Sequence, residues 1–558
     1  MKDKFSLKKL LISILPGIAV AFAGCFMLCF YAPLELYLTN HKEFWFTSGQ
    51  MLPVLLLMLL AAFLLLVLLL AGARLLGEKA YALLLALGFA AVLAFYVQGN
   101  FLVKNLPGLD GTVVDWSAYP AERIKSLAVW AGAIVLALLL KKLFGAKTFG
   151  NIALVGCAGL ALMLGITVGT LFLTVDEAEK SNLPVATDRD LFTMSEDKNL
   201  VVLILDAIDG CEFEKIVYAD DEYMELFSDF TYYDNTMSGY PYTDCSEVLY
   251  LTGSWHEAEM EPTEYVKKAV EASPLFSGLE QQGYNTGLYS TTTLLLDGIP
   301  AERFANLTTA QPGVRSQSFM AKLMLKMTAV KYAPWDLKFF GYDLLGRQNE
   351  NKAYGGDDGC EYFDWTNVGF YSRIKDHNPI VTTDEAMAKI IHLDGAHVPI
   401  RYDKYLNITD EATYQSGIEG SIFLFKNYAQ RLKEAGVYDN TAIVVMSDHG
   451  YARSEDENLS TLQQHPILLV KGIGESGDEL DVNNAPISYE DLAQALVKLA
   501  GGEGGNNIFP WNEGDARERR FLMYEWTDLN YFEEYVQTGQ AEDMDTLLPT
   551  GRIFEYAG

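Results

Sequence analysis

Long apolar segments near the N-terminus constrain the fold of this chain more than any other feature. Five runs without charged residues precede residue 176, at about 10–34, 51–73, 80–98, 126–140 and 148–175. Most reach the roughly 20 residues that a helix needs to cross a bilayer. They are apolar on every face, which argues against helices that cover a water-soluble core. We therefore expect residues 1–175 to form a transmembrane domain of five helices.

Basic residues between these runs predict how the chain crosses the membrane. Lysines precede the first run, and Lys or Arg residues lie in the 74–79 and 141–147 segments. With five spans these segments share one side, which the positive-inside rule makes cytoplasmic. We expect a multi-pass protein of the cell membrane whose N-terminus is cytoplasmic and whose residues after 176 are extracytoplasmic. The first run is too long to be a cleavable signal peptide.

Charge divides the chain at the same point. Residues 1–175 hold 13 Lys and Arg against 7 Asp and Glu, whereas the rest of the chain holds 29 against 66. So acidic a surface does not attract nucleic acid, and we expect no such partner. The polar segment 176–198 is expected to be a linker, and residues 199–558 are expected to form one large exported domain.

Strand and helix patterns alternate along the exported part. Strands are predicted at 199–205, 284–289, 386–393, 441–446 and 466–471, and helices at 274–283, 414–435 and 488–500. Such alternation is typical of a mostly parallel central sheet covered by helices on both faces. We expect this α/β fold for the exported domain.

Two aspartates follow predicted strands. Asp448 and His449 follow the strand at 441–446, and Asp206 follows the strand at 199–205, with Asp209 further into the loop. Ligands of open α/β sheets gather at this edge of the sheet, and carboxylate oxygen with imidazole nitrogen suits Zn²⁺ or Mn²⁺. The alternative is that these residues are only polar turns.

A run of turn residues and hydroxyls, SGYPYTDCSEVLYLTG, occupies residues 238–253 and leads into a predicted helix. A hydroxyl at a helix N-terminus meets free backbone N–H groups and the positive end of the helix dipole, which favour a bound phosphate or sulfate. The alternative is that Thr243 or Asp244 only caps the helix.

The histidines of the exported part also indicate a functional site. The exported part holds six, and four of them lie near predicted strand ends. A single histidine of this kind is more often structural, but four together favour a metal and oxyanion site. The six are His256, His377, His392, His397, His449 and His465.

The apolar runs, the strand before Asp206, the hydroxyl turn, HLDGAHVP and SDHG occur in an order that resembles the sulfatase/alkaline phosphatase superfamily. The resemblance is to its membrane-anchored phosphotransferase branch, which includes lipoteichoic acid synthases and lipid A phosphoethanolamine transferases. Those relatives likewise have five spans and an exported catalytic domain.

The nucleophile distinguishes the branches of this superfamily. Sulfatases carry C/S-x-P-x-R, with a Thr-Gly pair nine and ten residues after its first residue. Counting back from Thr252 reaches Thr243, with Cys245 at the proline position and Glu247 at the arginine position. The sulfatase signature is absent, and the resemblance implies a threonine nucleophile, with Cys245 as the alternative.

The resemblance also implies a site. One divalent ion, Mn²⁺ or Zn²⁺ with Mg²⁺ possible, would be held by Asp206, Thr243, Asp448 and His449. His397 and His465 match histidines that contact the phosphoryl group, and His392 would orient the loop that carries His397. Many of these transferases have glutamate at the position of Asp206, so this chain departs from them there.

The implied function is the metal-dependent transfer of a phospholipid headgroup phosphate, glycerol phosphate or phosphoethanolamine, through a covalent phosphothreonine. The donor would be a membrane phospholipid and the acceptor a cell-envelope glycan, polymer or lipid. One alternative is a phosphodiesterase, phosphatase or sulfatase-like hydrolase on the same scaffold. Another is a non-catalytic membrane sensor of lipid. Cys211, Cys245 and Cys360 allow at most one disulfide within the exported domain, and the sequence does not select the pair.

Overall fold

The computed structural model divides into two compact units. One comprises Met1–Ser181 with Gln311–Gly355, and the other Asn182–Ala310 with Gly356–Gly558; we call them the helical unit and the α/β unit. The structure describes residues 7–41, 44, 46–107, 114–175, 184–309, 313–314, 316–342, 354–355, 361–376, 380–451, 463–525 and 528–556. His377 and Cys360, both noted in the sequence, lie outside these ranges.

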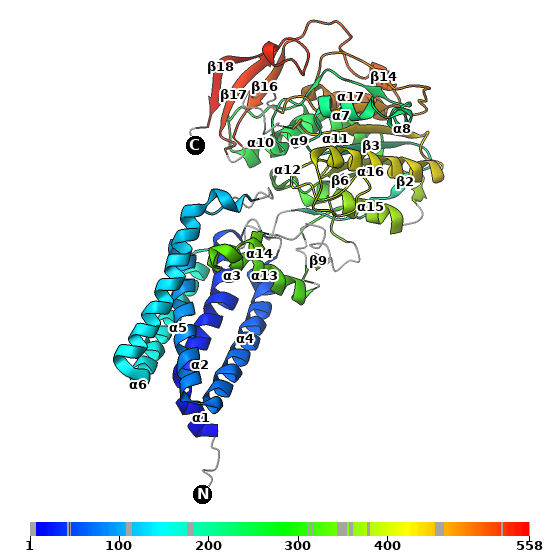
Figure 1. The fold of residues 1–558 in the computed structure, drawn as a ribbon. Helices are drawn as coiled ribbons and strands as arrows, with labels where there is room; N and C mark the ends of the chain where they lie inside the picture. The colour runs from blue at the N-terminus through cyan, green and yellow to red at the C-terminus, as the bar shows by residue number, and fades with distance from the viewer. Residues whose placement is uncertain are drawn as a thin grey trace. The chain divides into compact units, whose positions relative to one another are not determined.

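The helical unit contains the apolar runs. Among the described residues, four helices are long and apolar enough to cross a membrane, where five were expected. The difference lies in α6, which holds both the 126–140 and the 148–175 runs. These runs are separated at Gly145, inside the 141–147 segment, where a non-helical φ of 73° suits a residue without Cβ, so α6 consists of two helices joined at a kink. The helices (Figure 1) are α1 (Leu7–Ser13), α2 (Leu15–Phe26), η1 (Met27–Tyr31), α3 (Ala32–Thr39), α4 (Ser48–Leu76), α5 (Glu78–Phe101) and α6 (Pro120–Thr174).

Helix α13 (Gln317–Tyr332) belongs to the helical unit although it lies far along the chain. Met320 and Met324 are buried in the same apolar cluster as residues of α3, α4 and α5. Lys331 Nζ lies 2.7 Å from Glu35 Oε2 of α3. The expected single domain of residues 199–558 is therefore interrupted, because residues 311–355 join the helical unit. This insertion also contains β8 (Gly313–Val314), η6 (Trp335–Leu337), α14 (Phe339–Tyr342) and β9 (Tyr354–Gly355).

A seven-stranded sheet forms the centre of the α/β unit, in the order β14–β4–β13–β12–β3–β11–β6. The neighbouring strands β12, β3, β11 and β6 run parallel, as strand–helix alternation predicts, whereas β13 is antiparallel to β12. The strands are β3 (Asn199–Leu205), β4 (Thr231–Tyr232), β6 (Tyr284–Tyr289), β11 (Ala386–Leu393), β12 (Thr441–Met446), β13 (Leu468–Lys471) and β14 (Asp481–Val482).

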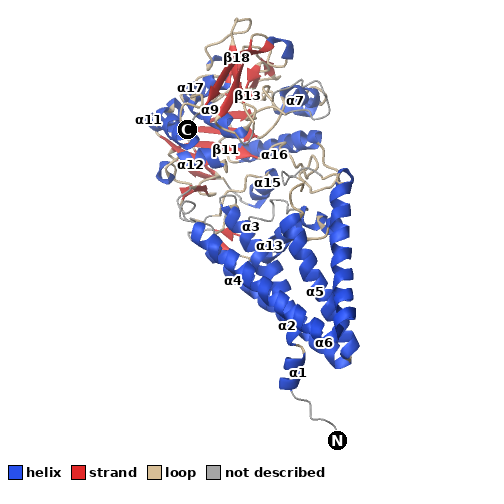
Figure 2. Cartoon of the chain, turned by 90° about the vertical axis from the view of Figure 1, so that its left-hand side faces the viewer, coloured by secondary structure: helices blue, strands red, loops and turns tan. Residues whose placement is uncertain are grey.

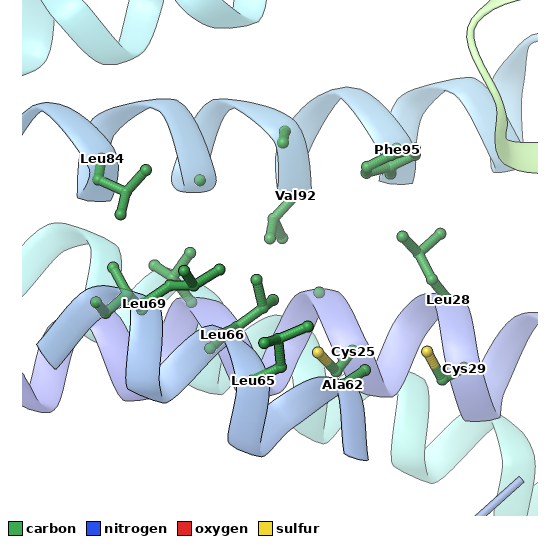
Figure 3. Close-up of a pocket in the computed structure, with 16 residues that line it drawn as sticks. Cys25, Leu28, Cys29, Ala62, Leu65, Leu66, Leu69, Leu84, Val92 and Phe95 are labelled. Atoms are coloured by element: carbon green, nitrogen blue, oxygen red, sulfur yellow. The ribbon is translucent and has the colours of Figure 1, made fainter. Parts of the chain in front are cut away.

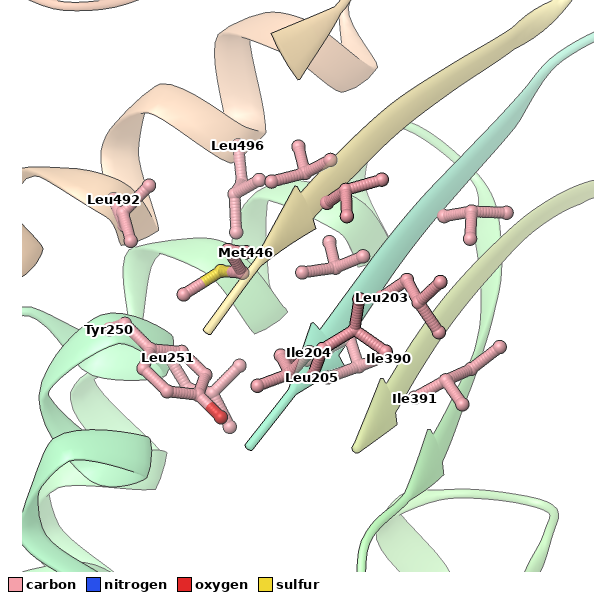
Figure 4. Close-up of a cluster of buried hydrophobic side chains, with 14 of the residues drawn as sticks. Leu203, Ile204, Leu205, Tyr250, Leu251, Ile390, Ile391, Met446, Leu492 and Leu496 are labelled. Carbon is pink, nitrogen blue, oxygen red and sulfur yellow. The ribbon is translucent and has the colours of Figure 1, made fainter. Parts of the chain in front are cut away.

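Helices cover both faces of this sheet, as Figure 2 shows. α9, α11 and α17 contact one another, and α16 contacts α7 and α15. Figure 4 shows Leu492 and Leu496 of α17, and Tyr250 of α9, beside Met446 of β12. Every residue of β3, β11 and β12 is buried, and burial on both faces explains why β3 and β12 read as nearly continuous apolar runs. The helices are α7 (Gly210–Val217), α9 (Thr243–Thr252), α11 (Pro274–Gln281), α15 (Asn367–Asp376), α16 (Tyr414–Glu434) and α17 (Leu492–Ala500).

Shorter elements complete the α/β unit. The segment predicted to be a linker, 176–198, already contributes two strands to it, which pair with β7 and β10. A separate antiparallel sheet is formed by β16, β17 and β18. The remaining elements are β1 (Val185–Ala186), β2 (Thr193–Ser195), α8 (Asp221–Leu226), β5 (Thr236–Met237), α10 (Pro262–Ala272), α12 (Thr293–Gly298), β7 (Leu307–Thr308), β10 (Val381–Thr383), β15 (Ile487–Ser488), β16 (Arg519–Met523), β17 (Tyr531–Gln537) and β18 (Leu547–Glu555).

Candidate active site

The register of three parallel strands brings two aspartates together. Ile204 of β3 pairs with His392 of β11 on one side and with Met446 of β12 on the other. Asp206 and Asp448 each follow these paired positions by two residues, so they leave the sheet at the same level. This is the carboxyl edge at which α/β sheets bind ligands.

Asp206, Asp448 and His449 form a buried group whose ligand atoms all lie within 4.8 Å of one another. His449 Nε2 lies 3.7 Å from Asp206 Oδ1 and 3.5 Å from Asp448 Oδ2. The other ring nitrogen, Nδ1, donates to the carbonyl oxygen of Gly450 at 2.6 Å. That bond fixes the ring and leaves the Nε2 lone pair facing the carboxylates, as in histidines that bind metals.

Asp448 is held rigidly. Its Oδ1 accepts hydrogen bonds from the backbone N–H groups of Ala207, at 3.1 Å, and His449, at 2.9 Å. Its backbone carbonyl accepts from the Ser246 hydroxyl at 2.6 Å. Ala207, which supplies one of these donors, has a left-handed φ of 57°, a strained conformation that is common at functional sites. The carboxylate therefore has one defined orientation, with Oδ2 facing the site.

Thr243 begins helix α9 and supplies the fourth predicted member of the group. Its hydroxyl donates to Asp448 Oδ2 at 2.6 Å. The helix has Tyr242 at its N-cap position and no side-chain capping bond, so neither Thr243 nor Asp244 caps it. The capping alternative is wrong, and the hydroxyl is committed to the aspartate at the positive end of a ten-residue helix.

These residues fit a divalent cation. Asp206 Oδ1 and His392 Nε2 are buried and have no hydrogen-bond partner within the described part of the chain. Burial alone would raise the pKa of Asp206, but the surrounding histidines, His397 foremost, hold that pKa well below its usual range. A buried set of carboxylate oxygens and one imidazole nitrogen, with an orphaned oxygen, matches the ligands of Zn²⁺ and Mn²⁺.

His392 and Glu247 form a second layer behind this group. His392 Nε2 lies 3.7 Å from Asp206 Oδ2, and its Nδ1 lies 3.7 Å from Glu247 Oε1. Glu247 is fully buried, and its Oε2 accepts from the Ser290 hydroxyl at 3.2 Å. Burial alone would lower the pKa of His392, but the nearby carboxylates raise it well above its usual range. His392 thus lies between Glu247 and the carboxylates of Asp206 and Asp448, where it can orient both.

Substitution of Glu247 tests this second layer. Glu247→Gln keeps the shape of the side chain but removes the charge that faces His392, so we expect the affinity for Mn²⁺ or Zn²⁺ to fall by about 10- to 100-fold. Calorimetric titration of the purified full-length protein measures this change. Glu214→Gln is the matched control, because Glu214 accepts a hydrogen bond from the Tyr232 hydroxyl outside the site. Equal affinities for wild type and Glu247→Gln would show that His392 needs no such partner.

The other two predicted histidines, His397 and His465, have different surroundings. His397 lies near enough to Asp206 to be the main charge that lowers its pKa, and its Nδ1 donates to the carbonyl of Val398 at 2.6 Å. His465 directs Nε2 to the carbonyl oxygen of Asp234 at 2.7 Å and Nδ1 to Cys211 Sγ at 3.6 Å, so both of its ring nitrogens have partners within the chain. Its contact with a phosphoryl group, which the resemblance implies, stays a prediction.

The structure also shows the surroundings of two other candidate residues, Asp209 and Cys245. Asp209 caps α7 by accepting from the Glu212 N–H group, so it is not part of the metal group. Cys245 is completely buried, and burial strongly raises its pKa, which leaves it an unreactive thiol. Cys211 and Cys245 are both free, so neither is in a disulfide.

The loop of the HLDGAH motif packs directly on Asp206. The backbone N–H of Ala396 donates to the Asp206 carbonyl at 2.8 Å. Gly395 has a φ of 49°, and a Cβ there would lie 2.3 Å from the Asp206 backbone nitrogen. Asn367, which no sequence motif marked, holds this glycine by donating from Nδ2 to its carbonyl oxygen at 3.0 Å. Only glycine allows the loop to approach the metal group this closely.

We therefore expect Gly395→Ala to displace Asp206. A displacement of about 1 Å at an active site costs about 100-fold in rate, which a turnover assay would detect. Gly436→Ala is the control, because Gly436 also has a left-handed φ, 72°, but no atom lies within 4 Å of its added Cβ. It carries the same backbone strain and should retain the wild-type rate. Parallel losses in the two variants would contradict a specific role for the Gly395 contact.

Comparisons with known proteins add the following. No protein-family model and no curated protein matches the chain. Among solved structures, the chain matches the lipoteichoic acid synthase LtaP of Listeria monocytogenes at 12% identity, with 64% of this chain and 89% of that chain covered and a TM-score of 0.34. A protein in the alkaline phosphatase superfamily from Vibrio parahaemolyticus matches at 14% identity, 68% and 88% coverage and a TM-score of 0.33. The phosphonate monoester hydrolase of Silicibacter pomeroyi matches at 14% identity, 65% and 89% coverage and a TM-score of 0.34.

Proposed function

We propose that the chain is a metal-dependent transferase that moves a phospholipid headgroup phosphate onto a cell-envelope acceptor by way of Thr243. The observation that carries this proposal is the 2.6 Å hydrogen bond from the Thr243 hydroxyl to Asp448, a member of the buried group with Asp206 and His449. Such a bond, from a hydroxyl at a helix N-terminus to a buried carboxylate, supports a nucleophilic role for Thr243.

Asp206, Asp448 and His449, with the Thr243 hydroxyl, would hold the cation. When bound, a divalent cation lowers the pKa of a hydroxyl and stabilises charge on phosphoryl oxygens. The chain's own residues supply proton transfer and stabilise the negative charge of the phosphate. Asp448 Oδ2 lies within proton-transfer reach of the Thr243 hydroxyl, and its two backbone donors keep it aimed there. The amino end of α9 favours negative charge at the reacting phosphate.

The proposed reaction has two displacements. Thr243 Oγ attacks phosphorus and loses its proton to Asp448, the bond from phosphorus to the diacylglycerol oxygen breaks, and the proton passes to the departing diacylglycerol. The headgroup phosphate then remains as a diester on Thr243. In the second step an acceptor hydroxyl attacks the same phosphorus, and Thr243 leaves with the proton of that hydroxyl.

The apolar helices support a lipid donor. They have the length and composition of membrane spans, and a chain anchored in a bilayer meets phospholipid headgroups at high effective concentration. On this proposal the α/β unit is extracytoplasmic, as the basic residues between the runs predict. Glycerol phosphate and phosphoethanolamine are the headgroups, and a glycan, polymer or lipid is the acceptor.

A lipid panel tests the proposal. Full-length protein in nanodiscs is given phosphatidylglycerol or phosphatidylethanolamine with a labelled diacylglycerol part, together with Mn²⁺, Zn²⁺ or Mg²⁺ or a chelator. We expect metal-dependent release of diacylglycerol from one of the two lipids. Recovery of the headgroup as a free phosphate ester, even with acceptor hydroxyls present, would identify a hydrolase instead. Absence of release from both lipids with every metal would favour a non-catalytic sensor.

A further inference from the structure

An apolar cavity of about 440 Å³ lies within the helical unit, between α2, α4 and α5 (Figure 3). Figure 3 shows Leu66 and Ala62 of α4 and Cys25 of α2 on one side, with Val92 and Phe95 of α5 on the other. All the lining side chains are apolar or thiols. No polar or charged group of the lining distinguishes one headgroup or ion from another, so the cavity suits a hydrocarbon.

Small residues create this space. Gly24 of α2, Gly88 of α5, and Ala62 of α4 all line it. A Cβ on Gly88 would lie 3.1 Å from Val20 Cγ1, and a Cβ on Gly24 would lie 3.4 Å from Val92 Cγ2. The helices therefore approach closely at these glycines, and the volume beside them is left by the absence of larger side chains.

The dimensions of the cavity match one acyl chain. An apolar cavity of about 150 Å³ holds benzene, with six carbons, so the observed volume has room for roughly 18 carbons. The lining residues of α5 run from Leu84 to Phe95, which spans about 16 Å along a helix. That length is close to half of the roughly 30 Å hydrocarbon core of a bilayer.

The cavity is accessible from the side. Leu65, Leu66 and Leu69 of α4 line it and are 58%, 38% and 54% exposed. Since α4 has the composition of a membrane span, these leucines face hydrocarbon. A lipid chain can thus enter between α4 and α5, and it gains dispersion contacts that an empty space would forfeit.

We propose that this cavity binds one acyl chain of a membrane phospholipid as a defined site, separate from the lipid that surrounds every membrane protein. The site recognises the chain and not the headgroup. This proposal does not depend on the proposed transferase activity, because binding of an acyl chain in the cavity can be measured without any turnover.

Photo-crosslinking of the full-length protein tests the proposal. Nanodiscs contain a small fraction of phosphatidylcholine with a diazirine in the middle of one 16-carbon chain, and labelled peptides are located by mass spectrometry after irradiation. We expect label on the cavity-lining segments of α2, α4 and α5. Ala62→Phe fills the cavity and should reduce this label by about tenfold or more. Ala61→Phe, at the exposed neighbouring position of the same helix, should not.

A second groove supplies an internal standard. It lies between α2 and α6, is lined by Ala19, Phe22, Ala158 and Ile166 among others, and contains no residue of α4. Label there should be equal in wild type and both variants, which shows that each variant is folded and inserted. Ala91→Phe, on the α5 side, should repeat the loss seen with Ala62→Phe. Uniform label over all lipid-facing helices, or cavity label that survives both fillings, would overturn the proposal.

Discussion

Replacement of Thr243 by alanine is expected to abolish diacylglycerol release, by at least about 10³-fold relative to wild type. The substitution removes the oxygen that would form the covalent diester. Cys245 is two residues away but is fully buried, with a pKa raised by that burial. The rate is measured in nanodiscs with the lipid and metal that support wild-type turnover.

A matched threonine provides the control. Thr263 lies in the first turn of α10 and donates to Asp297 Oδ2 at 2.8 Å, so it repeats the threonine–aspartate bond of Thr243 outside the site. Thr263→Ala should retain the wild-type rate. Thr243→Ser keeps the hydroxyl and should retain measurable release. If Thr243→Ala and wild type released diacylglycerol equally, Thr243 would not be the nucleophile.

Asp448→Asn is expected to remove bound metal and with it all turnover. Oδ1 already accepts two backbone N–H groups, so the amide oxygen of asparagine keeps that place and the NH₂ group takes the place of Oδ2. An NH₂ group cannot bind a cation, and it would face both the Thr243 hydroxyl and His449. We expect the metal affinity to fall at least about 100-fold, more than the loss of an outer partner causes. Titration calorimetry and the metal content of the purified protein measure this change.

Asp364→Asn is the comparison for that variant. Asp364 is also buried and accepts from the N–H and hydroxyl of Thr366 through Oδ1, but it lies outside the metal group. It should keep wild-type metal content. Because the two Oδ1 bonds survive in Asp448→Asn, that variant should still fold and, with a chelator present, unfold near the temperature of metal-free wild type. Retention of a full equivalent of metal by Asp448→Asn would contradict the assigned ligand.

Much of the α/β unit was predictable because its strands are buried on both faces. The strands at 199–205, 284–289, 386–393 and 441–446 appear in the structure with the predicted bounds. Strand ends also located the metal group, because parallel neighbours in register must present the residues that follow them at one edge. Asp206 and Asp448 could therefore be paired from the sequence alone.

Contacts that depend on tertiary packing could not be predicted. The partners of His465 lie 231 and 254 residues away, so its sequence context gave no sign that both ring nitrogens are occupied. The insertion of α13 into the helical unit depends on contacts with α3, α4 and α5, and its own apolar pattern is weak. The position of Glu247 near the site could have been predicted, because it lies four residues after Thr243 and residues at that spacing share a helix face.

On the proposed mechanism Thr243 carries the headgroup phosphate as a covalent diester. The mass of the intact protein tests this directly after reaction with phosphatidylglycerol or phosphatidylethanolamine and metal, in the absence of an acceptor. We expect an added mass equal to one glycerol phosphate or phosphoethanolamine group, located on the peptide that contains Thr243 and lost when acceptor hydroxyls are supplied. Release of diacylglycerol with no such adduct, or an adduct on another residue, would contradict it.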